Sequence, residues 1–141
     1  MEEGTLNPTV IVKPGAIAKI LTFLKDTESL QFDSLMNLAG NDSDGLSDLS
    51  IIYHLYSTTL HHYITLKVFT SRETPRVDSV ATIYQTANWH EREAYDLYGV
   101  IFEGHPDLKR ILMEDDWEGF PLRKDYTPAE FYRGMRIEKV K

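Results

Sequence analysis

The sequence predicts an α+β protein: a two-layer domain with a helix packed on a small antiparallel sheet, followed by helices and an extended C-terminal arm. Three observations lead to this class. An amphipathic stripe lies near the N-terminus, segments rich in Ile, Tyr, Thr and Val follow it, and regular periodicity ends near residue 100. Because 141 residues is the size of a single domain, we expect an α+β core at 1–100 and an arm at 101–141 that form one structural unit.

The first helix is expected at residues 16–26, "AIAKILTFLKD", directly after Pro14 and Gly15. Its apolar residues recur at intervals of three and four, which places them on one face of a helix. They are Ile17, Ile20, Leu21 and Leu24. Residues 1–13 show no such pattern, so we expect a short extended or poorly ordered entry there.

Three segments rich in β-branched and aromatic residues predict an antiparallel sheet of about three strands. They span 32–40, 46–57 and 62–71. In the third segment every second residue is apolar (Ile64, Leu66 and Val68), which is the pattern of a half-buried strand. The joint at 57–61 is short enough for a hairpin loop.

A second helix is expected at 78–87, "DSVATIYQTA", after Pro75 has ended the third strand. Asp78 or Ser79 would provide its N-cap, because short polar side chains accept hydrogen bonds from the first free backbone N–H groups of a helix.

A third helix is expected at 88–99, "NWHEREAYDLYG". Asn88 would cap its N-terminus, and Glu91 stands three residues later, where its carboxylate could close a capping box. Gly99 is placed to end the helix in the left-handed conformation, followed by Val100 as the apolar residue that such an ending favours.

The segment from residue 101 onward has no regular periodicity but is rich in prolines, glycines and aromatic residues. Long irregular segments in compact domains are either functional or disordered, and disordered segments are poor in aromatic residues. This one contains Trp117, Phe120, Tyr126 and Phe131. We therefore interpret it as an arm that is ordered by packing on something.

The composition argues against several classes of function. The formal net charge is −7 and the sequence pI is about 5.2, whereas a nucleic-acid-binding surface needs positive charge. The chain has no cysteine, so disulfides, thiolate-bound zinc and an iron–sulfur cluster held by its own cysteines are excluded. Without a long apolar run or a signal-peptide pattern, a cytoplasmic location is expected, with membrane association only through another protein.

A metal or hydrolytic site is weakly supported by the sequence. No pair of histidines has the H-E-x-x-H spacing that puts two ligands on one helix face, and no P-loop or G-x-G-x-x-G motif is present. Glu93 and Asp96 share a helix face, and Arg92 and Asp96 could pair at i, i+4, which is common on solvated helices. A small metal-dependent hydrolase using His90, Glu93 and His105 is the rival hypothesis from another class.

An interaction surface fits the arm better. "HPDLKRIL" and "DWEGFPLRKDY" interleave arginines, aspartates and aromatic residues, which are the side chains that anchor protein interfaces. By composition alone, a charged solvated loop is an equally good interpretation.

The stretch 86–126 as a whole, "TANWHEREAYDLYGVIFEGHPDLKRILMEDDWEGFPLRKDY", resembles the signature region of the C subunit of proton-pumping NADH:quinone oxidoreductases, respiratory complex I. The family includes the equivalent subunit of cyanobacterial and chloroplast NADH-dehydrogenase-like complexes and of energy-converting hydrogenases. The E-R-E, Y-D, G-H-P-D-L, R-I-L, D-W and P-L-R-K-D-Y elements occur in the family's order and spacing. On matching positions, the motif comprises Glu91, Arg92, Glu93, Tyr95, Asp96, Gly104, His105, Pro106, Asp107, Leu108, Arg110, Asp116, Trp117, Pro121, Leu122, Arg123, Lys124, Asp125 and Tyr126.

The resemblance implies a non-catalytic scaffold subunit of the peripheral arm, on the cytoplasmic face of the cell membrane or thylakoid. It implies packing against the quinone-site subunit, which is similar to the large subunit of hydrogenases, and against iron–sulfur subunits. The chain itself would bind no cofactor; iron–sulfur clusters, flavin and quinone would lie in neighbouring subunits, which pass electrons to quinone and translocate protons. The residues expected at the interface are Glu91, Arg92, Glu93, Asp96, His105, Asp107, Arg110, Trp117, Arg123, Lys124, Asp125 and Tyr126.

Two positions depart from the family pattern. Phe120 stands where many relatives have histidine, and Lys109 stands where many have arginine. These departures leave the subtype open: the parent complex could be a membrane-bound energy-converting hydrogenase or a ferredoxin-linked complex instead.

Overall fold

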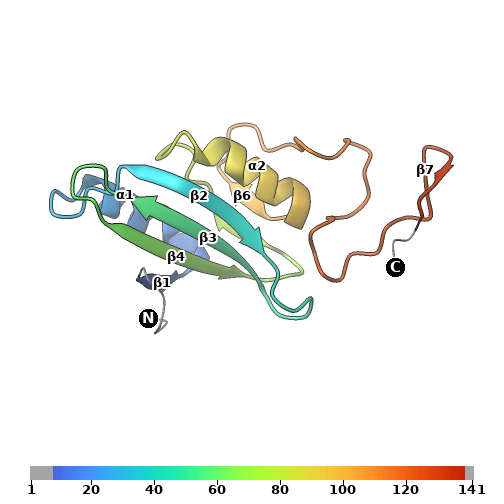
Figure 1. Ribbon diagram of the computed structural model, residues 1–141, viewed down its shortest axis with the longest axis horizontal. Coiled ribbons are helices and arrows are strands. Elements are labelled where there is room, and N and C mark those ends of the chain that lie inside the picture. The colour runs from blue at the N-terminus through green and yellow to red at the C-terminus, as the bar shows by residue number, and fades with distance from the viewer. Residues whose placement is uncertain (1–7, 139–141) are drawn as a thin grey trace.

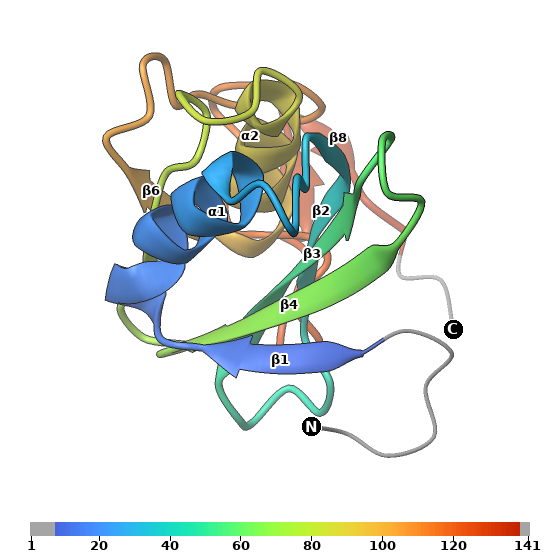
Figure 2. The ribbon, with the colours of Figure 1, turned by 90° about the vertical axis from the view of Figure 1, so that its left-hand side faces the viewer.

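The computed structural model describes residues 8–138 and has two layers, with both α-helices on one face of a sheet (Figures 1 and 2). This confirms the α+β class. In chain order the elements are β1 (Thr9–Val12), the 3₁₀ turn η1 (Pro14–Ala16), α1 (Ile17–Asp26), β2 (Ser34–Asn41), β3 (Leu49–Tyr56), β4 (Tyr63–Thr70), β5 (Arg76–Asp78), α2 (Ala87–Tyr98), β6 (Ile101–Glu103), β7 (Phe131–Tyr132) and β8 (Met135–Arg136).

The main sheet has the strand order β1-β4-β3-β2. The three expected strands are confirmed as the antiparallel β2, β3 and β4, and the expected hairpin joins β3 to β4. The expectation of a purely antiparallel sheet is wrong at one edge, where β1 pairs parallel to β4 and brings Val12 beside Val68. Four residues are too few to display a period-2 pattern, so the sequence showed only an extended entry where the structure has a strand.

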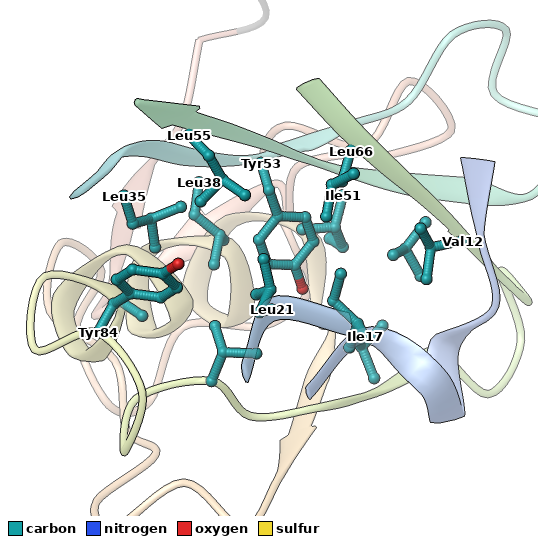
Figure 3. Packing of buried hydrophobic residues seen from close by; sticks show 14 of the residues in the cluster. Val12, Ile17, Leu21, Leu35, Leu38, Ile51, Tyr53, Leu55, Leu66 and Tyr84 are labelled. Atoms are coloured by element: carbon teal, nitrogen blue, oxygen red, sulfur yellow. The ribbon is translucent and has the colours of Figure 1, made fainter. Parts of the chain in front are cut away.

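The core lies between the sheet and α1 (Figure 3). The expected helix is confirmed, and Ile17, Leu21 and Leu24 on its apolar face are buried. They pack in one cluster with inward-facing residues of the strands, among them Tyr53 and Leu66. Each fully buried aliphatic side chain of this kind stabilises the fold by about 1.5–3 kcal/mol relative to exposure. The core therefore fixes the sheet on which α2 and the arm are mounted.

The helix expected at 78–87 does not form. Residues 76–78 are instead the strand β5, which pairs parallel to β6, and turns follow up to the start of α2. Val80 and Tyr84 are buried in the core, and the Tyr84 hydroxyl donates to the Phe32 carbonyl at 2.6 Å. These long-range contacts hold the segment in a non-helical path despite its local helical pattern.

The third expected helix is confirmed as α2, but its start differs from the expectation. Thr86 occupies the N-cap position without a side-chain hydrogen bond, and Asn88 lies inside the first turn. The expected capping box is absent because Glu91 points its carboxylate to Ser79 and Val80. The expected ending is confirmed: Gly99 has φ +77°, and its N–H donates to the Tyr95 carbonyl at 2.8 Å.

The C-terminal arm leaves the body after β6 and passes along α2 before it projects to one side (Figure 1). The first residues of the predicted arm, 101–103, pair with β5, and Phe102 is buried in the core. Beyond them the chain is irregular until the short hairpin of β7 and β8. We use "arm root" for residues 104–113 and 119–125, which contact the body, and "arm tip" for residues 114–118 and 126–137.

Candidate functional site: the anchored C-terminal arm

Three carboxylates are buried within residues 8–138, and all three lie where the arm meets the body. They are Asp42 after β2, and Glu91 and Asp96 on α2. A buried carboxylate is costly unless it is paired and hydrogen-bonded. Their partners therefore show how the arm is held.

Asp96 is the main anchor of the first part of the arm root. One of its oxygens, Oδ2, accepts the backbone N–H groups of Ile111, Leu112 and Met113 at 3.1, 2.6 and 3.0 Å. The other, Oδ1, accepts from Arg110 Nη1 at 3.1 Å. Three successive amides can converge on one oxygen only if the chain wraps around it, so Asp96 determines the path of residues 110–113.

Asp42 anchors the second part of the arm root. Arg72 binds both of its carboxylate oxygens, and the backbone N–H of Lys124 donates to Oδ2 at 2.8 Å. Arg72 also contacts Asp125 at 3.3 Å. The hydrogen bond from Arg72 holds the pKa of Asp42 well below its usual range, with the Lys124 and Gly45 amides acting in the same direction and burial opposing them. The carboxylate is thus charged throughout the neutral pH range.

Phe120 packs against two arginines of the arm root. Its ring lies beneath the guanidinium groups of Arg110 and Arg123, with charge-to-centroid distances of 5.2 and 5.1 Å. Arg123 also donates to the Tyr98 carbonyl at 2.6 Å, at the end of α2. The departure from the family pattern at this position is therefore compatible with cation–π stacking by an aromatic ring.

Replacing Gly99 by Ala is expected to lower the free energy of unfolding by about 2 kcal/mol. A Cβ atom there would lie 2.5 Å from the Phe120 ring, and the positive φ is unfavourable for a residue with a side chain. Gly104→Ala is the matched control, since Gly104 also has positive φ but no atom within 4 Å of its Cβ position. Urea unfolding should show a loss of about 1 kcal/mol for the control; equal losses would show that the Phe120 contact adds nothing.

Glu91 links α2 to both the 79–80 segment and the start of the arm. Its carboxylate accepts from the Ser79 hydroxyl at 2.6 Å and from the Val80 N–H at 2.7 Å, and it lies 3.9 Å from His105 Nε2. Burial raises the pKa of Glu91 to about 7, against the lowering effect of its two hydrogen bonds.

His105 is fixed by two backbone contacts. Its Nδ1 accepts the Asp107 N–H at 3.0 Å, and its Nε2 lies 3.0 Å from the Asn88 carbonyl. An Nδ1 that accepts a hydrogen bond carries no proton, so the ring is neutral and Nε2 donates to Asn88. This histidine therefore closes the turn after β6 onto α2.

The arm tip has a small aromatic cluster of its own. Trp117 lies 5.0 Å from Tyr132 between ring centroids, and the Tyr132 hydroxyl donates to Asp116 at 2.7 Å. Arg133 donates to the same carboxylate at 3.2 Å. The hairpin of β7 and β8 is thus folded back on the Asp116–Trp117 turn by a few polar contacts and one ring pair.

The structure brings most of the predicted interface residues together along α2 and the arm, but in different roles. Eight of them hold the arm through contacts within the chain: Glu91, Arg92, Asp96, His105, Arg110, Arg123, Lys124 and Asp125. Exposed members are Glu93, Asp107, Lys124 and Asp125, and Trp117 and Tyr126 are half-buried at the tip. Their contact with a partner stays a prediction.

The Arg92–Asp96 pair expected at i, i+4 does not form. The guanidinium carbon of Arg92 lies 4.5 Å from the Trp89 ring centroid, and Arg92 Nε donates to the Lys109 carbonyl at 3.2 Å. Asp96 instead accepts a hydrogen bond from Arg110. Glu93 is exposed and Asp96 is buried, so they do not share an environment either.

The anchors Asp42 and Arg72 were not predicted from the sequence. They lie 30 residues apart in turn-forming segments, and no local spacing marks them as partners of the arm. The only signal was the cluster of turn formers "GNDSDG", which indicates a loop and nothing more.

The rival hydrolase is not supported by the arrangement of its residues. Among residues 8–138, no group of three or more His, Cys, Asp and Glu side chains is placed to hold a metal ion. Glu93 is exposed, whereas both ring nitrogens of His105 are engaged in backbone contacts.

Among residues 8–138, no helix is long and apolar enough to cross a membrane.

Comparison with known proteins gives the same family on three counts. The family model described as the 30 kDa subunit of respiratory-chain NADH dehydrogenase matches residues 10–132. The C subunit of NADH-quinone oxidoreductase from Chloroherpeton thalassium is 50% identical over 119 residues, which are 84% of this chain and 49% of that protein. Its counterpart from Chlorobium phaeobacteroides is 47% identical over 84% of this chain and 72% of its own length. The chain thus spans about half the length of the first of these relatives.

Two solved structures share the fold. A trypsin-resistant fragment of Nqo5 aligns with a TM-score of 0.67 and 27% identity, over 77% of this chain and 87% of that one. A chain of the membrane-bound sulfane sulfur reductase, an archaeal respiratory membrane complex, aligns with a TM-score of 0.75 over 90% of this chain and 75% of its own. At 24% identity the second match speaks for the fold alone. By its sequence and its fold, the chain belongs to the family of the 30 kDa subunit of respiratory-chain NADH dehydrogenase.

Proposed function

We propose that this chain is a non-catalytic scaffold subunit in the peripheral arm of a complex I-type NADH:quinone oxidoreductase. Its C-terminal arm docks on the quinone-site subunit, the one similar to the large subunit of hydrogenases, and other contacts reach the iron–sulfur subunits. The relatives named as the C subunit of NADH-quinone oxidoreductase support this assignment. The attachment to the cytoplasmic face of the membrane then comes through the complex.

The observation that carries the proposal is the contrast between the arm root and the arm tip. The root is held by buried carboxylates, with exposed fractions of 1% for the Asp42 side chain and 0% for Asp96. The tip projects from the body, away from the sheet (Figure 1). A projecting segment with a rigid base is suited to present aromatic and charged side chains to a neighbour without a large entropic cost on binding.

The contribution to electron transfer is indirect in this proposal. The chain has no cysteine with which to hold an iron–sulfur cluster. As part of the proposal, the clusters, flavin and quinone all belong to neighbouring subunits. Electron transfer to quinone, coupled to proton translocation, depends on fixed distances between those groups. An anchored arm that spans a subunit boundary helps to hold such distances constant.

The test is native purification of the complex with Arg123→Ala, which removes the contacts to Tyr98 and Phe120. We expect the variant to co-purify with fewer subunits of the peripheral arm and to lose turnover in proportion. Glu73→Ala is the matched control, because Glu73 is an exposed charge on the body with no ion pair among the described residues. Normal assembly with lost turnover would instead assign Arg123 a catalytic role.

The identity of the co-purifying subunits also separates the alternatives. Recovery of a nickel–iron subunit or of a ferredoxin-binding subunit would indicate an energy-converting hydrogenase or a ferredoxin-linked complex. Recovery of this polypeptide alone, active by itself, would overturn the scaffold proposal.

A further inference from the structure

The arm tip forms a partly open cavity of about 230 Å³, and four of its nine lining residues are aromatic. Trp117 and Tyr126 line it from the irregular part of the arm, and Phe131 and Tyr132 line it from the β7 strand. It is smaller than the roughly 300–1,000 Å³ pockets that enclose small-molecule ligands. Its size therefore suits a single side chain better than a cofactor.

The cavity is built by contacts within the tip and does not depend on the body. Asp116 is bound by the Tyr132 hydroxyl and by Arg133, and Arg133 also lies 3.7 Å from Glu114. At the hairpin turn both Arg133 and Gly134 have positive φ, which matches a tight two-residue turn between β7 and β8. These contacts hold the Tyr132 ring in place beside the Trp117 ring, with the two centroids 5.0 Å apart.

The charge of the arm tip is negative. Residues 114–118 and 126–137 carry five carboxylates and two guanidinium groups, a net charge of −3. Arg133 is neutralised by Asp116 and Glu114, and Arg136 lies 3.8 Å from Glu130. Within residues 8–138, Asp115 and Glu118 have no ion pair, and Glu118 lines the cavity.

A lining that combines aromatic rings with a carboxylate is an environment that favours a cation. The faces of Trp and Tyr rings carry negative potential, which attracts a desolvated cation placed over them. The chain's own cation at this site, Arg133, sits 5.2 Å from the Tyr132 ring and is already paired. The remaining negative charge at Glu118 is therefore available for a second cation.

We propose that this cavity receives a lysine or arginine side chain of the subunit on which the arm docks, with the rings around the cation and Glu118 as its counter-ion. The inference rests on the proposed function and adds the chemistry of the contact. It assigns Trp117 and Tyr126 to the walls of a pocket and makes Glu118, which the family motif does not include, the residue that selects for positive charge.

The test measures how much of the chain stays on the purified complex as the NaCl concentration rises. Glu118→Gln should weaken retention about fivefold, and Glu118→Arg about tenfold or more, because the cation then meets a like charge. Tyr126→Leu should weaken it about fivefold by removing a ring face, while Tyr126→Phe should retain wild-type behaviour. Glu73→Arg, the same charge reversal on the body, should change nothing.

Each other outcome counts against the pocket. Wild-type retention of Glu118→Arg would overturn the proposal. An effect of Glu118→Arg without one of Tyr126→Leu would indicate an ordinary surface ion pair, and equal losses for Tyr126→Phe and Tyr126→Leu would show that the ring is not what matters. If the wild-type chain co-purifies with no subunit at all, the proposed scaffold function is wrong. If it co-purifies but the variants behave like the wild type, only the proposed pocket is wrong.

Discussion

Replacing Asp96 by Ala is expected to lower the free energy of unfolding by about 3–5 kcal/mol, the largest effect expected for a single substitution among the residues that anchor the arm root. The substitution leaves Arg110 half-buried without its carboxylate and strands three backbone N–H groups, from Ile111 to Met113, that now converge on Oδ2. Each unsatisfied buried donor costs about 1–3 kcal/mol, although relaxation of the arm will recover part of the sum.

The measurement combines urea unfolding with hydrogen exchange. In the variant, the amides of residues 111–113 should exchange faster than in the wild type, because their acceptor is gone. Asp107→Ala is the matched control: Asp107 is an exposed aspartate of the same arm root whose side chain pairs with Lys109, at 3.2 Å. Its loss should change the free energy of unfolding by at most about 1 kcal/mol. Similar effects of the two variants would contradict the anchoring role of Asp96.

The second large effect concerns pH and Glu91. Because burial raises the pKa of Glu91 from 4.5 to about 7, the native state holds a proton that the unfolded chain releases more readily. Stability from this group is therefore fully present below pH 4.5 and is lost as the pH rises through 7. With about 1.4 kcal/mol for each pKa unit, the loss amounts to roughly 2–3 kcal/mol between about pH 5 and pH 8.

Glu91→Gln isolates this contribution. The amide oxygen keeps an acceptor for the Val80 N–H. The amide NH2 replaces the oxygen that accepts from the Ser79 hydroxyl, so the direction of that hydrogen bond reverses, and the side chain does not titrate. Urea unfolding at about pH 5 and pH 8 should show a smaller decrease for the variant than for the wild type. The lowered pKa of Asp42 acts only at acidic pH and is common to both proteins. Parallel pH profiles would show that Glu91 is charged at little cost in the native state.

The elements that the sequence predicted well are those specified by local patterns. The stripe from Ile17 to Leu24 produced α1, the alternation through Leu66 produced β4, and Gly99 ended α2. In each case the required information lies within a few turns of helix or a few alternating residues. The family, likewise, was evident from one continuous stretch of about forty residues and is confirmed by the match over 10–132.

The elements that failed were those where a distant residue overrode a local preference. Residues 78–87 have a helical pattern, but Glu91 takes the Val80 N–H and the Tyr84 hydroxyl reaches Phe32, so the chain turns instead. Asn88 is a good capping residue on its own, yet α2 begins before it. Arg92 and Asp96 have the spacing of an ion pair, but Arg92 donates to the Lys109 carbonyl and Asp96 accepts from Arg110.

The sequence by itself determined the α+β class, the helix α1, the three antiparallel strands, the end of α2 and the family, because each depends on periodicity or on a contiguous motif. Only the tertiary structure decided what the motif's charges do. A buried carboxylate without partners is strongly destabilising. Asp42, Glu91 and Asp96 are all buried, and each accepts hydrogen bonds from the arm or from loops that are distant in the sequence. Which charges become anchors and which stay free for a partner therefore depends on packing, and no spacing along the chain specifies it.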